Sequence, residues 1–296
     1  MSAAKTAALT LLALVAFASN SLLTRLALGT HEIDAASFTA IRLVAGAVML
    51  IALVVAQDRS WSAMKGTGIA GPLALFAYAA PFSFAYLRIG AAVGALILFG
   101  VVQLTMIGYG IARGERPSAT IWLGLVLAAA GLALLTVPSV TRPDPLGVLL
   151  MAIAGVAWAV YTLVGRGTTN PIAANARSFF WSAPLAIVLV LFVIGLHPEA
   201  QPSARGIVLA LVSGAVTSGL GYAIWYRALP SLTVTQAAVA QLSVPVIAAL
   251  GAVAVLGEAI SSRLVVAGAL VLSGVGLVLS ARARQPRVER STRASS

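Results

Sequence analysis

Long apolar runs separated by short polar breaks fill almost the whole chain. A membrane-spanning helix needs about 20 mostly apolar residues, and ten stretches of the chain meet this requirement. The breaks between them carry the charges, prolines and glycines that end helices. The pattern predicts an all-α, polytopic membrane protein with ten transmembrane helices. The predicted spans are residues 6–27, 35–56, 67–88, 91–112, 118–137, 145–165, 173–195, 206–228, 233–256 and 262–281.

The composition supports a membrane protein and excludes other classes. Hydrophobic residues make up 60% of the 296 residues and charged residues only 9%, whereas soluble proteins usually carry about 25% charged residues. Such a chain has too few polar side chains to cover a surface in water. A soluble enzyme and a DNA-binding domain are therefore excluded, in spite of the net charge of +11.

The residue types that build most catalytic and metal sites are scarce. The chain has no cysteine, which excludes disulfides, thiolate nucleophiles and zinc–thiolate sites. The histidines His31 and His197 lie in polar breaks, and no predicted span carries Asp or Glu near its centre. We therefore expect no catalytic residue, no metal and no cofactor. Glu115 and Glu258 lie at helix starts, where a carboxylate suits the positive end of the helix dipole, so capping or gating is their expected role.

The chain contains an internal repeat of five spans. Gly114-Glu115 and Gly257-Glu258 precede the fifth and tenth spans at an offset of 143 residues, and Gly131 and Gly274 follow at the same offset. Because five is an odd number, the second copy must enter the membrane from the opposite side, which is a common construction in secondary transporters. We expect two inverted repeats and a basic, disordered tail. They cover residues 1–140, 141–281 and 282–296.

Lysines and arginines in the breaks predict the orientation, because cytoplasmic loops carry an excess of them. With both termini in the cytoplasm, twelve Lys and Arg residues lie on the cytoplasmic side and five on the other. We expect a multi-pass protein of the inner membrane with a positive cytoplasmic face. Its expected partners are membrane lipid and a small-molecule substrate, and not nucleic acid. The sequence leaves the oligomeric state open, and the fold could work as a monomer.

These features resemble the drug/metabolite transporter superfamily, and within it the EamA-type branch. The resemblance rests on ten helices in two halves, the two Gly-Glu pairs, Arg42 early in the second span, and the pairs Gly124…Gly131 and Gly268…Gly274. It covers nearly the whole chain and implies a transporter that exports metabolites by alternating access. The chain length and the aromatic-rich central helices are also similar to the aromatic amino acid exporters of that family, which makes an amino acid the first substrate to expect.

Side chains at helical spacing predict a cavity of aromatic and amide groups between the halves. Core packing is the alternative for each aromatic residue. Tyr86 and Tyr226 end their spans and are assigned instead to the aromatic belt at the membrane interface. The predicted substrate-binding residues are Asn20, Tyr78, Phe82, Phe99, Gln103, Trp158, Tyr161, Tyr222, Trp225 and Gln241.

An uncharged pocket of this kind suits a neutral or zwitterionic solute. Trp158 could hold an ammonium over its ring, and Asn20 or Gln103 could donate to a carboxylate. Arg42 and Arg177 lie inside predicted helices, where we expect them to snorkel or to brace a neighbouring helix. Binding of an anionic substrate is the alternative. Without Lys or Arg in the cavity, sugar phosphates are disfavoured. The alternatives are a broad exporter of drugs or lipophilic cations and, from another class, an intramembrane enzyme or a lipid scramblase.

Helix breakers predict where the spans bend. Pro81 and Pro245 each remove a backbone hydrogen bond within a span. At the repeat offsets, Gly221 corresponds to Pro81, and Gly100 corresponds to Ser243, two residues before Pro245. We predict hinges at Pro81, Gly100, Gly221 and Pro245, with static kinks as the alternative. The lack of a central acidic residue favours facilitated transport, although proton coupling through Glu32, Asp34 or Glu258 stays open.

Overall fold

The computed structural model describes residues 1–58, 68–89, 91–136, 144–196, 202–256 and 260–281. Every regular element in these ranges is helical, and no strand occurs in them. The all-α class predicted from the sequence is confirmed. The elements are α1 (Ala3–Leu28), α2 (Ala35–Asp58), α3 (Ala70–Tyr86), α4 (Ala91–Ala112), α5 (Ala119–Thr136), α6 (Pro145–Arg166), α7 (Pro171–Leu196), α8 (Ala204–Val212), η3 (Ser213–Leu220), α9 (Gly221–Ala228), η4 (Leu229–Ser231), α10 (Val234–Ala240), η5 (Gln241–Ser243), α11 (Val244–Leu256) and α12 (Ser262–Ser280).

These elements make a bundle of membrane-spanning helices. Within the described ranges, nine helical runs are long and apolar enough to cross a membrane, among them the continuous runs α8–η3–α9 and α10–η5–α11. The helix α3 has 17 residues, which is close to the lower limit of about 17 for a span, and it is the tenth. Large apolar side chains also lie exposed on the outer faces, such as Leu104, Val188 and Phe192. Helices that are apolar on all sides belong in lipid, so the chain is a multi-pass membrane protein.

Local sequence signals set the helix ends. Asp144 caps α6 by accepting a hydrogen bond from the Gly147 amide at 2.9 Å, and Pro145 follows in the first helical position, where a proline loses no hydrogen bond. Thr233 and Gln236 form a capping box at the start of α10. Each signal satisfies backbone groups that a helix end would otherwise leave unpaired.

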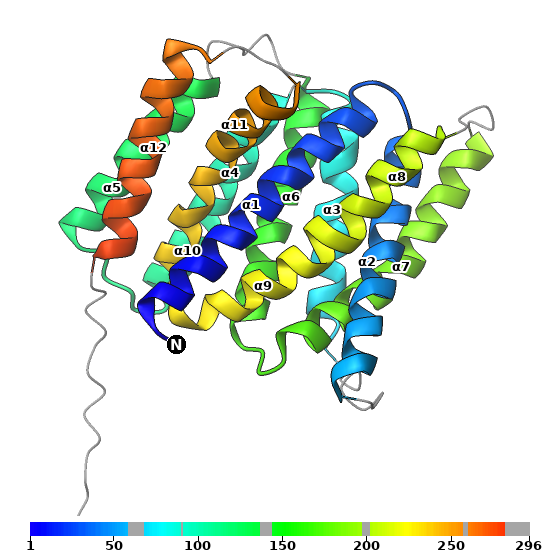
Figure 1. Cartoon of the computed structure of the whole chain (residues 1–296), viewed down its shortest axis with the longest axis horizontal. Helices are drawn as coiled ribbons and strands as arrows, with labels where there is room; N and C mark the ends of the chain where they lie inside the picture. Colours follow the sequence, from blue (N-terminus) through cyan, green and yellow to red (C-terminus); the bar gives the residue numbers. More distant parts are fainter. Residues whose placement is uncertain (59–67, 90, 137–143, 197–201, 257–259, 282–296) are drawn as a thin grey trace, which may run out of the picture.

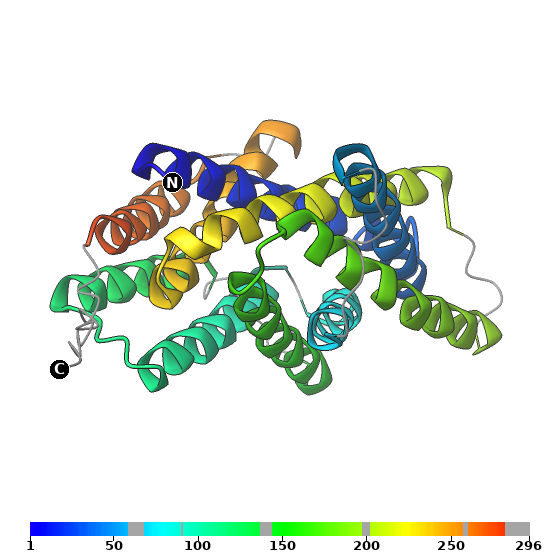
Figure 2. The same cartoon turned by 90° about the horizontal axis from the view of Figure 1, so that it is seen from below.

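The helices pair across the two halves of the chain (Figure 1). Figure 1 shows α5 beside α12 at one edge of the bundle and α2 beside α7 toward the other, with α1, α6, α3 and α9 between them. Seen from below, the helices form a broad slab (Figure 2). Each packing between the halves has a counterpart at the repeat offset. Thus α3 packs on α6 as α9 packs on α1, and α4 packs on α6 as α11 packs on α1.

Direct evidence for inversion comes from α5 and α12. A Cβ added to Gly124 would collide with the Gly274 carbonyl, and one added to Gly274 would collide with the Gly124 carbonyl. Seven residues further along α5, Gly131 lies against the Ala267 carbonyl. The contacting residue numbers rise along α5 and fall along α12, so the two helices are antiparallel. Gly131 and Gly274 are repeat equivalents, so the contact is of the reciprocal kind that a two-fold axis produces.

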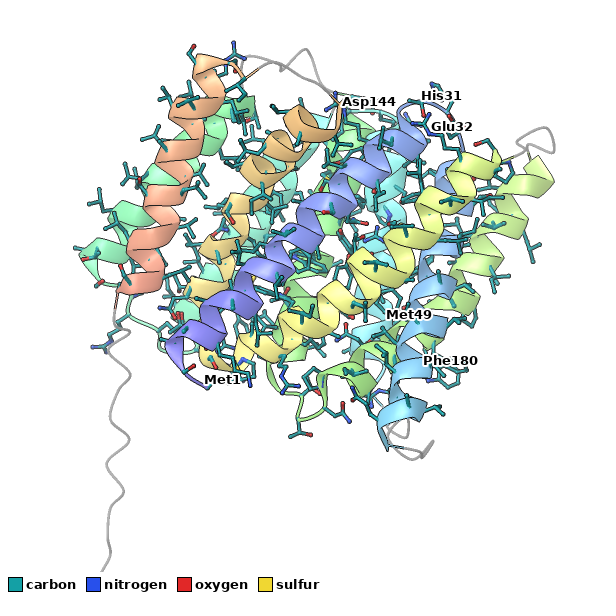
Figure 3. All side chains as sticks on the ribbon, in the orientation of Figure 1. Met1, His31, Glu32, Met49, Asp144 and Phe180 are labelled. Atoms are coloured by element: carbon teal, nitrogen blue, oxygen red, sulfur yellow. The ribbon has the colours of Figure 1, made fainter. Side chains whose placement is uncertain are left out.

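The first helix of each half points the opposite way. In Figure 3, Met1 at the start of α1 lies at one end of the bundle and Asp144 at the start of α6 lies at the other. Figure 1 places the end of α12 at the same end as the start of α1. The predicted boundary between residues 140 and 141, the tail 282–296 and the Gly257-Glu258 pair all lie outside the described residues.

Two spans of the second half are interrupted near the positions predicted to bend. The π-helical segment η3 ends immediately before Gly221, and the 3₁₀ turn η5 ends two residues before Pro245. In the first half, Pro81 lies within the single helix α3 and Gly100 within the single helix α4. The backbone therefore changes its hydrogen-bonding pattern at two of the four predicted hinges.

Candidate substrate site

Aromatic side chains from both halves meet at the centre of the bundle. The ring of Trp158 on α6 lies 5.2 Å from Phe17 on α1, 4.9 Å from Tyr78 on α3 and 4.8 Å from Tyr222 on α9, measured between ring centroids. These spacings fall in the range of favourable aromatic pairs. Trp158 is thus the hub of a cluster that joins the first helix of each half to the repeat-related helices α3 and α9.

A small cavity adjoins this cluster. Its volume is about 30 Å³, which is room for a water molecule or two and not for a metabolite. This conformation is therefore closed around the centre, and a solute could enter only if the walls moved apart. The cavity is lined by Phe17, Asn20, Ser21, Tyr78, Phe82, Leu98, Phe99, Trp158, Tyr222 and Val244.

Two amide side chains supply polarity beside the cavity. Asn20 Oδ1 accepts hydrogen bonds from Ser213 Oγ at 2.7 Å and from Thr217 Oγ1 at 3.3 Å. Trp158 Nε1 donates to Gln241 Oε1, whose amide nitrogen donates in turn to the Ala237 carbonyl. Ser213 and Thr217 belong to η3, and Gln241 belongs to η5. Both helix interruptions therefore contribute hydrogen bonds to the walls of the site.

The structure separates the ten predicted substrate residues into two layers. Six of them line the cavity, and four lie outside this lining. Gln241 binds Trp158, while Trp225 packs edge-on against Phe17 at 5.7 Å. Tyr161 donates to Asn175 Oδ1 at 2.6 Å, and Gln103 donates to the Ala238 carbonyl at 2.6 Å. The six lining residues are Asn20, Tyr78, Phe82, Phe99, Trp158 and Tyr222.

One aromatic residue lies elsewhere than the sequence indicated. Tyr226 was expected in the interfacial belt, but it is 1% exposed and its hydroxyl donates to the Tyr161 carbonyl at 2.8 Å. The belt assignment is wrong because α9 packs this face against α6 and α7. A position near the end of a span reports depth in the membrane and does not report which side of the helix faces protein.

Sequence reasoning also underestimated Arg42 on α2. Its side chain is 1% exposed, so the expectation that it snorkels is wrong. It braces the neighbouring span, because Nε donates to Ser218 Oγ at 2.8 Å and Nη2 donates to Tyr222 Oη at 2.6 Å. Its guanidinium carbon lies 5.5 Å from the centre of the Tyr78 ring. Tyr78 and Tyr222 line the cavity, so an arginine does stand beside it. A charged residue inside an apolar span is by default a functional candidate, and that signal was available.

The two ends of the bundle differ. At the end where Glu32 lies in Figure 3, the Ser203 amide donates to the Glu32 carbonyl at 2.8 Å, and Arg205 Nη1 lies 3.3 Å from Glu32 Oε1. At the opposite end, a cavity of about 470 Å³ lies between the start of α3, the end of α6 and the start of α7. Arg177 and Tyr226 are among its lining residues. Contacts between the halves are therefore seen at one end and a cavity at the other, and Tyr226 links this cavity to Tyr161 of the aromatic cluster.

Glu115 joins the two halves at the start of α10. Its carboxylate accepts from the Val234 amide at 2.7 Å, from the Thr235 amide at 3.1 Å and from Thr235 Oγ1 at 2.7 Å. The capping role expected from the sequence is therefore observed, but on a helix of the other half rather than on α5. Its repeat partner Glu258 lies outside the described residues.

Comparison with known proteins agrees with this architecture. Residues 145–280 match the model of the EamA-like transporter family. The chain is 46% identical to the uncharacterized protein PA1977 of Pseudomonas aeruginosa over 98% of both chains. It is 27% identical to the uncharacterized transporter YwfM of Bacillus subtilis over 88% of this chain and 89% of that one. It is 23% identical to an uncharacterized transporter of Archaeoglobus fulgidus over 81% of this chain and 86% of that one.

A solved crystal structure has the same fold. The alignment covers 96% of this chain and 100% of the chain in that structure, with a TM-score of 0.80 and 20% sequence identity. The family model covers the second half of the chain, and the repeat extends the same construction to the first half. The chain is a membrane transporter and belongs to the EamA-like transporter family, within the drug/metabolite transporter superfamily.

Proposed function

We propose that this transporter moves small neutral or zwitterionic metabolites, and first of all amino acids with aromatic or large apolar side chains. The observation that carries the proposal is the aromatic cavity at the meeting of the two halves, with Asn20 in its lining and Gln241 behind Trp158. Apolar walls with a few placed polar groups are typical of small-molecule sites. The rings of Trp158 and Tyr78 could stack on an aromatic side chain or face an ammonium group.

The proposed mechanism is alternating access, with the inverted halves closing one end of the bundle at a time. The contacts between the halves at Glu32 and the cavity lined by Arg177 at the opposite end support this mechanism. If both termini are cytoplasmic, as the positive-inside rule predicts, the end with this cavity faces the cytoplasm of an inner-membrane protein. Loading from that side suits export. The interrupted spans beside the site are the proposed bending elements.

Counterflow in proteoliposomes tests the substrate class. Purified protein would be reconstituted with an internal pool of phenylalanine, and uptake of labelled phenylalanine, tryptophan, threonine, adenine and a quaternary ammonium would be compared. We expect phenylalanine and tryptophan to exchange fastest, and exchange to proceed without a pH gradient. If none of the amino acids moves, the substrate proposal is wrong. A strict need for a pH gradient would replace facilitated transport with proton coupling.

The second candidate, an exporter of drugs or lipophilic cations, has less support. Such a site is expected to offer a carboxylate to the cation. Among the described residues, none of the cavity-lining side chains is acidic, and the charged group beside the cavity is the cation Arg42. The quaternary ammonium in the panel separates the two candidates, and a lipid-flipping assay in the same vesicles tests the scramblase alternative.

A further inference from the structure

Arg42 is a buried cation beside the proposed site, and no carboxylate of the described residues is bonded to it. Its side chain is 1% exposed, and its bonded partners are the neutral hydroxyls of Ser218 and Tyr222. The third nitrogen, Nη1, is buried without a hydrogen-bond partner. Two ion pairs seen in the structure, Arg88 with Asp144 and Arg205 with Glu32, lie near the bundle surface.

Such an arrangement is costly for a merely structural role. A buried charge is stable only when it is paired and hydrogen-bonded, and a guanidinium has five donors to satisfy. Two hydroxyls and the face of one ring leave Arg42 incompletely satisfied. Bracing α2 against η3 could be achieved by a neutral hydrogen-bonding side chain at much lower cost. Charged side chains within spans are usually kept for substrates, ions or protons.

The position of Arg42 points the charge toward the cavity. Tyr78, over whose ring the guanidinium lies, and Tyr222, which accepts from Nη2, are both cavity-lining residues. Arg42 therefore contacts two of the side chains that form the cavity wall. The cavity must expand before any metabolite enters, and an expansion that moves these tyrosines would expose the guanidinium to the solute.

We propose that Arg42 binds the carboxylate of the transported solute. This inference rests on the proposed function and deepens it. A guanidinium matches a carboxylate through two parallel N–H···O bonds, and Nη1 is free to make one of them in the present conformation. The substrate would then be a monocarboxylate whose aromatic or apolar part lies among Trp158, Tyr78 and Phe82. An α-ammonium group would add a contact with the aromatic rings and would not be essential.

The wild-type protein provides the first test. Competition against labelled phenylalanine exchange would be measured for three compounds of similar shape: phenylalanine, 3-phenylpropionate and phenylalaninamide. The acids should compete at least about tenfold better than the amide, since a hydrogen bond to a charged group contributes about 1.5–3 kcal/mol. Equal competition by the acid and the amide would overturn the assignment of Arg42, while leaving phenylalanine exchange and the proposed function intact.

Substitutions then test whether Arg42 causes the preference for acids over the amide. Arg42→Gln should bring the acid-to-amide ratio close to one, and Arg42→Lys should restore part of it. Ser218→Ala is the matched control, because it removes one brace of Arg42 and keeps the charge, so the ratio should persist. If Arg42→Gln keeps the wild-type ratio, the inference is wrong. If Arg42→Gln fails to fold, Arg42→Lys decides: it keeps the charge but loses the planar fork of donors, so the ratio should fall below the wild-type value, whereas an unchanged ratio would contradict the inference.

Discussion

The two halves of the bundle are built on one plan, yet they differ where they meet the substrate site. In the first half, α3 and α4 are single helices. In the second half, their counterparts are broken by the π-helical segment η3 and the 3₁₀ turn η5. The first-half helix α3 presents Tyr78 and Phe82 to the cavity. At the repeat offset, Tyr78 corresponds to Ser218, whose hydroxyl accepts from Arg42.

The difference shows how a duplicated scaffold can produce an asymmetric site. Ser213 and Thr217 of η3 bond Asn20, and their counterparts in α3 are Leu73 and Ala77. At these equivalent positions α3 therefore carries rings and apolar side chains, whereas η3 carries hydroxyl groups on an irregular backbone. π-helical segments occur often at functional sites. The hydroxyl groups of η3 hold the Asn20 side chain in place among the aromatic rings that line the cavity.

The largest expected effect comes from breaking the glycine contact between the repeat-related helices α5 and α12. Gly131→Leu and Gly274→Leu, at repeat-equivalent positions of α5 and α12, each place a side chain where the partner helix has its backbone. Each should destabilise the protein by about 1–3 kcal/mol, to a similar extent because the contact is reciprocal. The control is Gly276→Leu, since a Cβ at Gly276 meets no atom within 4 Å. Melting in detergent and size-exclusion profiles would measure the effect, and a clear difference between the two seam variants would contradict reciprocity.

A second substitution tests the hydrogen bonds between Asn20 and η3. Asn20→Ala removes the acceptor of the Ser213 and Thr217 hydroxyls, and stability should fall by about 1–3 kcal/mol because buried polar groups lose a partner. Apparent affinity in counterflow should fall as well. Ser21→Ala, whose hydroxyl donates to the Phe17 carbonyl of its own helix, should cost less. Equal costs for the two variants would show that the contact between Asn20 and η3 contributes little.

A third comparison concerns the helix breakers. Pro245→Ala should slow exchange several-fold, because it allows the regular helical hydrogen bond to form after η5, whereas Pro81→Ala in the continuous helix α3 should have a smaller effect. Pro184→Ala, in the exposed part of α7, is the control. Initial rates at saturating phenylalanine would measure the effect. Similar rates for Pro81→Ala and Pro245→Ala would argue that both prolines make static kinks.

The smallest effect is expected at the helix caps of the two halves. Ser2 caps α1 and Asp144 caps α6. The hydrogen bond from the Gly147 amide lowers the pKa of the Asp144 carboxyl below its ordinary value, and the nearby Arg88 guanidinium lowers it further. A lowered folded-state pKa adds stability that is present above about pH 4 and is lost as the pH falls through the folded value. Asp144→Asn keeps a capping side chain and should remove this slight acid dependence of the melting temperature. An unchanged dependence would assign it to other groups.

The features predictable from the sequence were those set by local pattern. Span positions followed from apolar length, and the opposite orientation of the two halves followed from the odd number of spans in the repeat. Six of the ten predicted substrate residues line the cavity, because helical periodicity shows which side chains share a face.

The remaining features depend on how helices are rotated and packed in three dimensions. Sequence alone did not indicate that Tyr226 turns inward, or that Arg42 reaches Ser218 and Tyr222 on another span. Gly221 and Pro245 indicated weak points, but not the packing of the π-helical segment η3 against α1 and α2 or of the 3₁₀ turn η5 against α5 and α12. Glu115 was recognised as a helix cap, while the helix that it caps lies more than a hundred residues further along the chain.

The glycine contact between α5 and α12 also limits how the two copies can evolve after a duplication. The space left by the absent side chain of Gly124 is filled by the backbone at Gly274, and the reverse is equally true. A larger residue in one copy is tolerable only if the other copy yields at the same place. Substitutions in α5 and α12 are therefore coupled along this contact, whereas α3 and its counterpart have different side chains and a different backbone. An ancestral single-copy chain would have met this restriction as a homodimer.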